Sequence, residues 1–123
     1  MNTKPKLLIV EDDDLHQKVY NAVFSKHFDV TMCRDSAEFD TAIKKDRYHI
    51  FLIDISLVGA RDGVQLIEEL RQTEHYKTTP VMVVTANAFK KDEEIAMAAG
   101  ATRYYRKPID YKILVTEFKD SLL

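Results

Sequence analysis

The chain has 123 residues, 46% of them hydrophobic and 31% charged, which fits one domain with a single hydrophobic core. A formal net charge of -2 gives no bulk attraction to nucleic acid, and no segment approaches the roughly 20 apolar residues of a membrane span. The single cysteine, Cys33, excludes an internal disulfide, so we expect a soluble, cytoplasmic protein.

Strand and helix patterns alternate along the chain. Strands are predicted near residues 6–10, 29–33, 49–54, 80–85 and 103–106, and each is followed by a helix, near 14–27, 36–46, 63–72, 88–99 and 110–122. The first, third and fourth strands are continuous apolar runs, which is typical of strands covered on both faces. This order predicts an α/β fold with a doubly wound parallel sheet, and we expect residues 1–123 to form one domain.

Apolar residues at helical spacing predict the buried faces of the helices. The predicted stripes are, in the first helix, Leu15, Val19, Ala22 and Val23, and in the fourth helix, Ile95, Ala98 and Ala99. Asp13 and Asp14 suit a helix N-terminus. Asp35 and Asp110 are predicted to cap the second and fifth helices, and Gly100 to end the fourth.

Polar residues follow four of the predicted strands. Glu11 and Asp12 follow the first, Asp54 ends the third, Thr85 ends the fourth, and Lys107 follows the fifth. In an open parallel sheet, ligands bind at the carboxyl ends of the strands, so these side chains are expected to converge. Three carboxylates repel one another without a cation, and such oxygen ligands suit Mg²⁺ with a phosphoryl group.

In this order and spacing, the motifs resemble the receiver domain of bacterial two-component response regulators. The matching segments are Leu8-Ile9-Val10-Glu11-Asp12-Asp13, Asp54, Asp62-Gly63, Val84-Thr85-Ala86 and Gly100-Ala101…Tyr104…Lys107-Pro108. The resemblance covers essentially the whole chain. It implies a flavodoxin-like fold with five strands in the order 2-1-3-4-5 and five helices.

The resemblance also implies a role for each site residue. Asp54 is the nucleophile that accepts the phosphoryl group, Lys107 pairs with a phosphate oxygen, and the Thr85 hydroxyl bonds another. The Mg²⁺ ligands implied are the Asp12 and Asp54 carboxylates, Glu11 through water, and the main-chain carbonyl of Ser56. The bond between Lys107 and Pro108 is expected to be cis. Thr85 and Tyr104 are the expected switch residues.

The predicted function is a phosphorylation switch, not an enzyme beyond self-phosphorylation from small donors and self-dephosphorylation. The partners implied are a sensor histidine kinase or phosphotransfer protein, and an unidentified downstream protein that binds the fourth helix, fifth strand and fifth helix. No direct contact with nucleic acid or membrane is expected. The chain is expected to be a monomer or a phosphorylation-dependent dimer.

Several alternatives stay open. Thr85 also suits a turn hydroxyl, and Tyr104 also suits ordinary strand packing. A phosphatase of the haloacid dehalogenase type uses an aspartyl nucleophile too, but it needs a second Asp where this chain has Ser56. A flavin carrier of flavodoxin type needs a glycine- and hydroxyl-rich loop after the first strand, where this chain has four acids. The four histidines are dispersed and predict no metal site.

The segment after Asp54 departs from the common receiver pattern. From Asp54 to Gly63 is nine positions, one more than in the commonest receivers, and Val58 replaces the usual proline. Ser56 and Asn87 occupy the variable positions that flank the phosphoryl site in receivers. Both are small and polar, so we expect them to leave room for water.

Overall fold

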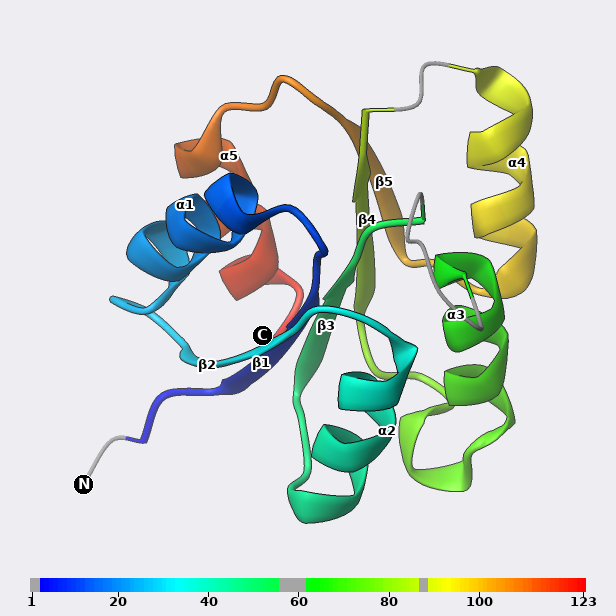
Figure 1. The fold of residues 1–123 in the computed structure, drawn as a ribbon, viewed down its shortest axis with the longest axis horizontal. Helices are drawn as coiled ribbons and strands as arrows, with labels where there is room; N and C mark the ends of the chain where they lie inside the picture. Colours follow the sequence, from blue (N-terminus) through cyan, green and yellow to red (C-terminus); the bar gives the residue numbers. More distant parts are fainter. Residues whose placement is uncertain (1–2, 56–61, 87–88) are drawn as a thin grey trace.

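A five-stranded parallel sheet forms the centre of the computed structural model, which describes residues 3–55, 62–86 and 89–123 (Figure 1). The strand order is β2-β1-β3-β4-β5, as predicted. The strands are β1 (Lys6–Val10), β2 (Asp29–Cys33), β3 (Ile50–Ile53), β4 (Val81–Thr85) and β5 (Arg103–Arg106). Ser56, Val58 and Asn87 lie outside the described residues, so the predictions made for them stay predictions.

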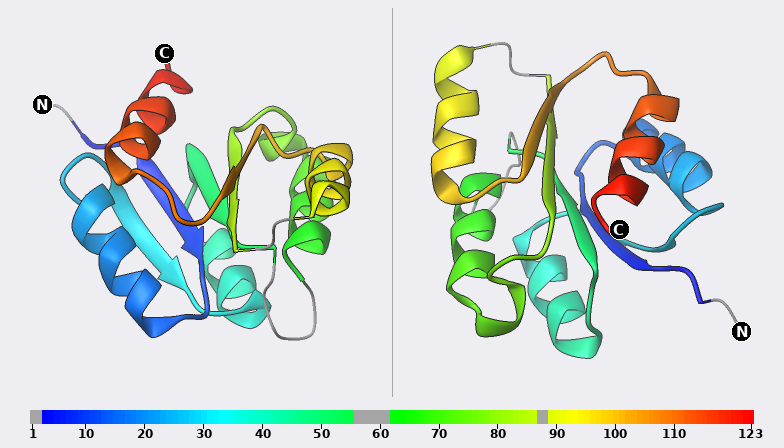
Figure 2. Two further views of the ribbon diagram at one scale, coloured as in Figure 1. Left: turned by 90° about the horizontal axis from the view of Figure 1, so that it is seen from above. Right: turned by 180° about the vertical axis from the view of Figure 1, so that it is seen from behind.

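Five helices cover the two faces of this sheet. They are α1 (Asp14–Phe24), α2 (Ser36–Lys45), α3 (Gly63–Gln72), α4 (Lys90–Ala99) and α5 (Tyr111–Asp120), with a short 3-10 turn η1 (Glu74–Tyr76) after α3. Helices α1 and α5 lie on one face, and α2, α3 and α4 lie on the other (Figures 1 and 2). None of the helices in the described part of the chain has the length and hydropathy of a membrane span.

Each face of the sheet has its own core, because the central strands are buried on both sides. Under α1 and α5, aromatic rings fill the space, and the rings of Phe24 and Phe118 stack with their centroids 4.9 Å apart. On the other face, Phe51 packs edge-on against Tyr76. Burying each such side chain contributes about 1.5–3 kcal/mol. These two cores hold the carboxyl ends of the strands in one fixed arrangement.

Two predicted helix faces are only partly correct, because Val19, Val23 and Ala99 are half-buried whereas other members of each stripe are exposed. In α1 the buried residues are Tyr20 and Phe24, whereas Leu15 is 67% exposed. Two aromatic rings spaced four residues apart cover more of the sheet than the smaller aliphatic side chains do, so they define the buried face. In α4 the buried residue is Ala96, and Ile95 is 42% exposed. The helix packs through a small side chain and leaves larger apolar ones on the surface.

Side-chain caps fix where the helices begin. Asp13, Asp35 and Asp110 each accept a hydrogen bond from a main-chain N–H in the first turn that follows. Asp62 and Gln65 form a reciprocal capping box at the start of α3. Gly100 ends α4 with a φ of 121°, a conformation that side chains with a Cβ rarely adopt. The predicted caps of the second and fifth helices are therefore confirmed, as is the predicted end of the fourth.

Arg71 ties the end of α4 to α3. Its Nε donates to the carbonyl of Gly100 at 2.8 Å, and its Nη1 donates to the carbonyls of Tyr76 at 2.8 Å and Thr79 at 2.7 Å. A guanidinium has five donors in a fixed plane, so it can join several carbonyls at once. One side chain thus holds together α3, η1, the approach to β4 and the residue that caps the end of α4.

Candidate functional site

Main-chain hydrogen bonds beyond the strands place the polar residues at one end of the sheet. The N–H of Glu11 donates to the carbonyl of Cys33, and that of Asp54 donates to Val10. The N–H of Lys107 donates to Thr85 in the same way, at 2.8 Å. Each of these three residues therefore continues the ladder of a parallel pair by one step. Sheet register, rather than loop flexibility, sets where these side chains begin.

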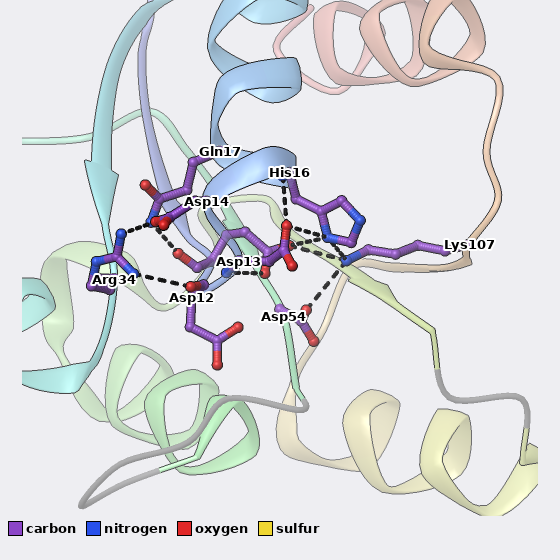
Figure 3. A network of polar contacts seen from close by, with 9 residues as sticks. Asp12, Asp13, Asp14, His16, Gln17, Arg34, Asp54 and Lys107 are labelled. Carbon is purple, nitrogen blue, oxygen red and sulfur yellow. Dashed lines mark hydrogen bonds and ion pairs between the residues drawn. The ribbon is translucent and has the colours of Figure 1, made fainter.

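Three of the predicted residues meet through one ammonium group (Figure 3). Lys107 Nζ lies 3.0 Å from Glu11 Oε1 and 3.4 Å from Asp54 Oδ2. It also lies 2.9 Å from Nδ1 of His16. The other carboxylate oxygen of Glu11 accepts from the N–H of Asp13 at 3.2 Å. The site thus joins the residues that directly follow β1, β3 and β5.

The site is buried and rich in negative charge. Glu11 is 1% exposed and Asp54 is 6% exposed. Burial raises the pKa of Glu11, and the nearby Asp54 carboxylate raises it further, while Lys107 opposes the shift. Two buried carboxylates beside a single ammonium favour a second cation. Their hard oxygen atoms suit Mg²⁺, so the donor set fits the predicted ion.

The remaining predicted metal ligands are Asp12 and Ser56. Asp12 is half-buried in the turn between β1 and α1, and its main-chain carbonyl accepts from Arg34 Nη1 at 3.2 Å. Arg34 also pairs with Asp14. Ser56 lies outside the described residues. Within the described ranges, no three His, Cys, Asp or Glu side chains are spaced to hold a metal ion. The ligand set stays a prediction.

The predicted switch residues occupy the last strands of the sheet. Thr85 is fully buried at the end of β4. Tyr104 is half-buried in β5, packs against the core on the side of α2, α3 and α4, and has the Arg106 guanidinium 5.9 Å from its ring centre. The bond between Lys107 and Pro108 is cis, as the resemblance implies. The switching roles of Thr85 and Tyr104 stay predictions.

Sequence reasoning missed two neighbours of the site. His16 was expected to be a dispersed histidine, yet it contacts Lys107, and Arg34 was not singled out although it holds the Asp12 turn. A signal existed for His16, because side chains in a helix lean toward its N-terminus and α1 begins at the site. Arg34 gives no comparable signal, because its contacts depend on how an exposed side chain folds back.

Comparison with known proteins gives one consistent family. The family model described as "Response regulator receiver domain" matches residues 7–119. The transcriptional activator protein PfeR of Pseudomonas aeruginosa is 35% identical over 105 residues, covering 85% of this chain and 33% of the relative. The transcriptional regulatory protein CseB of Streptomyces coelicolor is 32% identical over 120 residues, covering 97% of this chain and 50% of the relative. This chain therefore spans half or less of the length of these relatives.

Solved structures agree in fold. The receiver domain of the sensor histidine kinase PA1611 from Pseudomonas aeruginosa, described with a magnesium ion coordinated in its active-site cleft, superposes with a TM-score of 0.87 at 27% identity and covers 98% of both chains. The chemotaxis protein CheY4 of Vibrio cholerae superposes with a TM-score of 0.88 at 21% identity, over 98% of this chain and 100% of that one. With the family match over residues 7–119, these findings show that the chain belongs to the response regulator receiver domain family of two-component signalling.

Proposed function

We propose that this domain accepts a phosphoryl group from a sensor histidine kinase or a phosphotransfer protein onto Asp54, in a reaction that requires Mg²⁺. The observation that carries the proposal is the contact of Lys107 Nζ with both Asp54 and Glu11, residues far apart in the sequence. In the transfer, the nitrogen–phosphorus bond of a donor phosphohistidine breaks as an Asp54 Oδ–phosphorus bond forms. We also propose that residues 1–123 form one such domain.

Each described residue has a physical role in this proposal. Asp54 supplies the attacking oxygen, and its burial excludes bulk water from the new acyl phosphate. Lys107 stands 3.4 Å from that carboxylate, where its charge can pair with a phosphoryl oxygen. Thr85 ends β4, which pairs with β3, the strand that Asp54 follows, so a phosphoryl group on Asp54 would give the Thr85 hydroxyl a new acceptor. Glu11, Asp12, Asp54 and the Ser56 carbonyl would hold Mg²⁺, which would offset the charge of the phosphoryl group.

We further propose that phosphorylation alters a protein-binding face formed by α4, β5 and α5. This face carries paired charges of both signs, because Arg106 lies 3.6 Å from Glu93 and Arg103 lies 4.0 Å from Glu117. The side chain of Met97, 44% exposed, adds an apolar contact. Mixed charges around exposed apolar groups suit selective pairing with a protein more than with nucleic acid. The added charge on Asp54 would bias this face through β4 and β5.

Intact-mass measurement after incubation with acetyl phosphate tests the proposal. With Mg²⁺ present, one phosphoryl group should be added, and none should be added when the metal is chelated. Asp54→Asn should abolish the addition, whereas Asp29→Asn, at the exposed first position of β2, should leave it intact. Addition at full level in Asp54→Asn would show that the acceptor has been misassigned. The same sample treated with beryllofluoride should show amide shifts on α4, β5 and α5, and shifts confined to α1 and α2 would exclude the proposed face.

A further inference from the structure

His16 occupies a position at the site that none of the roles above explains. It lies in the first turn of α1, with its side chain about one-third exposed, and its Nδ1 is 2.9 Å from Lys107 Nζ. That separation is shorter than the 3.0 Å from Nζ to Glu11 and the 3.4 Å from Nζ to Asp54. Of these three contacts of the ammonium, the one to His16 is therefore the shortest.

The chemistry of the two groups fixes the direction of this contact. A lysine ammonium has three donors and no acceptor, so Nδ1 of His16 must supply the lone pair. The imidazole is then neutral and carries its hydrogen on Nε2. The alternative, in which Nδ1 carries the hydrogen and donates to Glu11 Oε1, requires the longer separation of 3.5 Å and leaves an N–H facing the ammonium 2.9 Å away, with no lone pair between the two nitrogens. His16 is thus an acceptor for Lys107.

The three acceptors divide the hydrogens of one ammonium between them. In Figure 3, the dashed lines from Nζ run to His16, Glu11 and Asp54, so a phosphoryl oxygen on Asp54 has to take a hydrogen that one of these acceptors now holds. We propose that His16 is a positioning residue: it holds Lys107 in the resting domain and competes with the phosphoryl group on Asp54 for that ammonium. This inference rests on the proposed phosphorylation of Asp54 and adds a residue that sets how readily the site accepts it.

Two substitutions separate the acceptor from the shape of the side chain. His16→Leu removes the lone pair and keeps the bulk. His16→Asn keeps an oxygen on Cγ, in the place where Nδ1 stands, and should restore the contact. Removing one hydrogen-bond acceptor for a cation should tighten beryllofluoride binding in the presence of Mg²⁺ about three- to tenfold in His16→Leu. His16→Asn should stay near the wild-type affinity. The matched control is His27→Leu, at an exposed position in the turn after α1, and it should change neither measurement.

Nitrogen NMR of the Lys107 ammonium in the unphosphorylated protein tests the contact with His16 by a measurement that does not depend on phosphorylation. The Nζ resonance should shift in His16→Leu and stay near its wild-type position in His16→Asn. An unchanged resonance in His16→Leu would overturn the proposal, as would equal beryllofluoride affinities in His16→Leu and the wild type. Equal changes in the Leu and Asn variants would reduce His16 to a packing role. Failure of the wild type to bind beryllofluoride would instead count against phosphorylation of Asp54, and the resonance would still decide the resting contact.

Discussion

Gly63 gives the sharpest test of how the fold positions the phosphoacceptor. It is the first residue of α3, and a Cβ placed on it would lie 2.5 Å from the carbonyl oxygen of Asp54 and 2.6 Å from Cα of Ile55. Both are main-chain atoms, so neither can turn aside as a side chain can. Gly63→Ala must therefore displace the backbone of Asp54 or the start of α3 by close to 1 Å, judged against ordinary contact distances.

Two effects of opposite sign decide the stability of this variant. Alanine favours a helix over glycine by about 0.5–1 kcal/mol, while forcing an extra carbon into a packed site costs about 1–3 kcal/mol. Close contact with main-chain atoms places the cost in the upper half of that range, about 2–3 kcal/mol, so with a gain of about 1 kcal/mol the net loss should be about 1–2 kcal/mol. With an unfolding entropy of roughly 2.1 cal/mol/K per residue, the melting temperature should fall by roughly 4–8 °C.

The same displacement should slow phosphorylation, because a shift of about 1 Å in a reacting group can cost about a hundredfold in rate. The assays are thermal unfolding by circular dichroism and the rate of phosphorylation by acetyl phosphate. Val64→Ala is the control, since it loses apolar packing in the same turn without pressing on Asp54. It should lower stability and leave the rate near that of the wild type. A Gly63→Ala protein that is more stable than the wild type would refute the reasoning.

Three further predictions concern charged residues. Burial raises the pKa of Glu11, so in metal-free buffer its ionisation destabilises the fold as the pH rises from about 4.5 through the raised pKa. The glutamine in Glu11→Gln does not ionise. Urea titrations should therefore show its free energy of unfolding increasing relative to that of the wild type over this pH range. A constant difference would contradict this. Arg71→Ala loses the donors to three carbonyls and should lower the free energy of unfolding by about 3 kcal/mol, and Arg71→Lys should lower it by less. A decrease below about 1 kcal/mol in Arg71→Ala would argue against the stabilising role of these three hydrogen bonds. Arg34→Ala should change the free energy of unfolding by less than about 1 kcal/mol, because the Arg34 side chain is exposed. It should nevertheless weaken Mg²⁺ binding measured by calorimetry, because the turn that carries Asp12 loses its hydrogen-bond donor. An unchanged Mg²⁺ affinity would exclude a role for Arg34 in positioning Asp12.

The sequence predicted the parts of the site that follow from strand periodicity. Glu11, Asp54 and Lys107 each extend a parallel ladder, so knowing where the strands end was enough to bring them together. His16 could not be placed that way, because its contact depends on where α1 begins and on which rotamer it adopts. The buried face of α1 was mispredicted for a related reason. Aliphatic spacing favoured Leu15, whereas the volume beneath the helix is filled by Tyr20 and Phe24.

The Arg71 clamp has a geometric consequence for the helix that it holds. It holds α4 at Gly100, the residue that directly follows the helix, whereas the opposite end of α4 faces the end of the sheet that bears Thr85. The 10 residues of α4 span about 15 Å. A rod fixed at one tip swings about that tip, so a tilt of a few degrees moves the far tip several times more than the atoms beside Arg71. The exposed side chains of Phe89 and Lys90 therefore have the longest arc available to this helix, and Ala99 has the shortest.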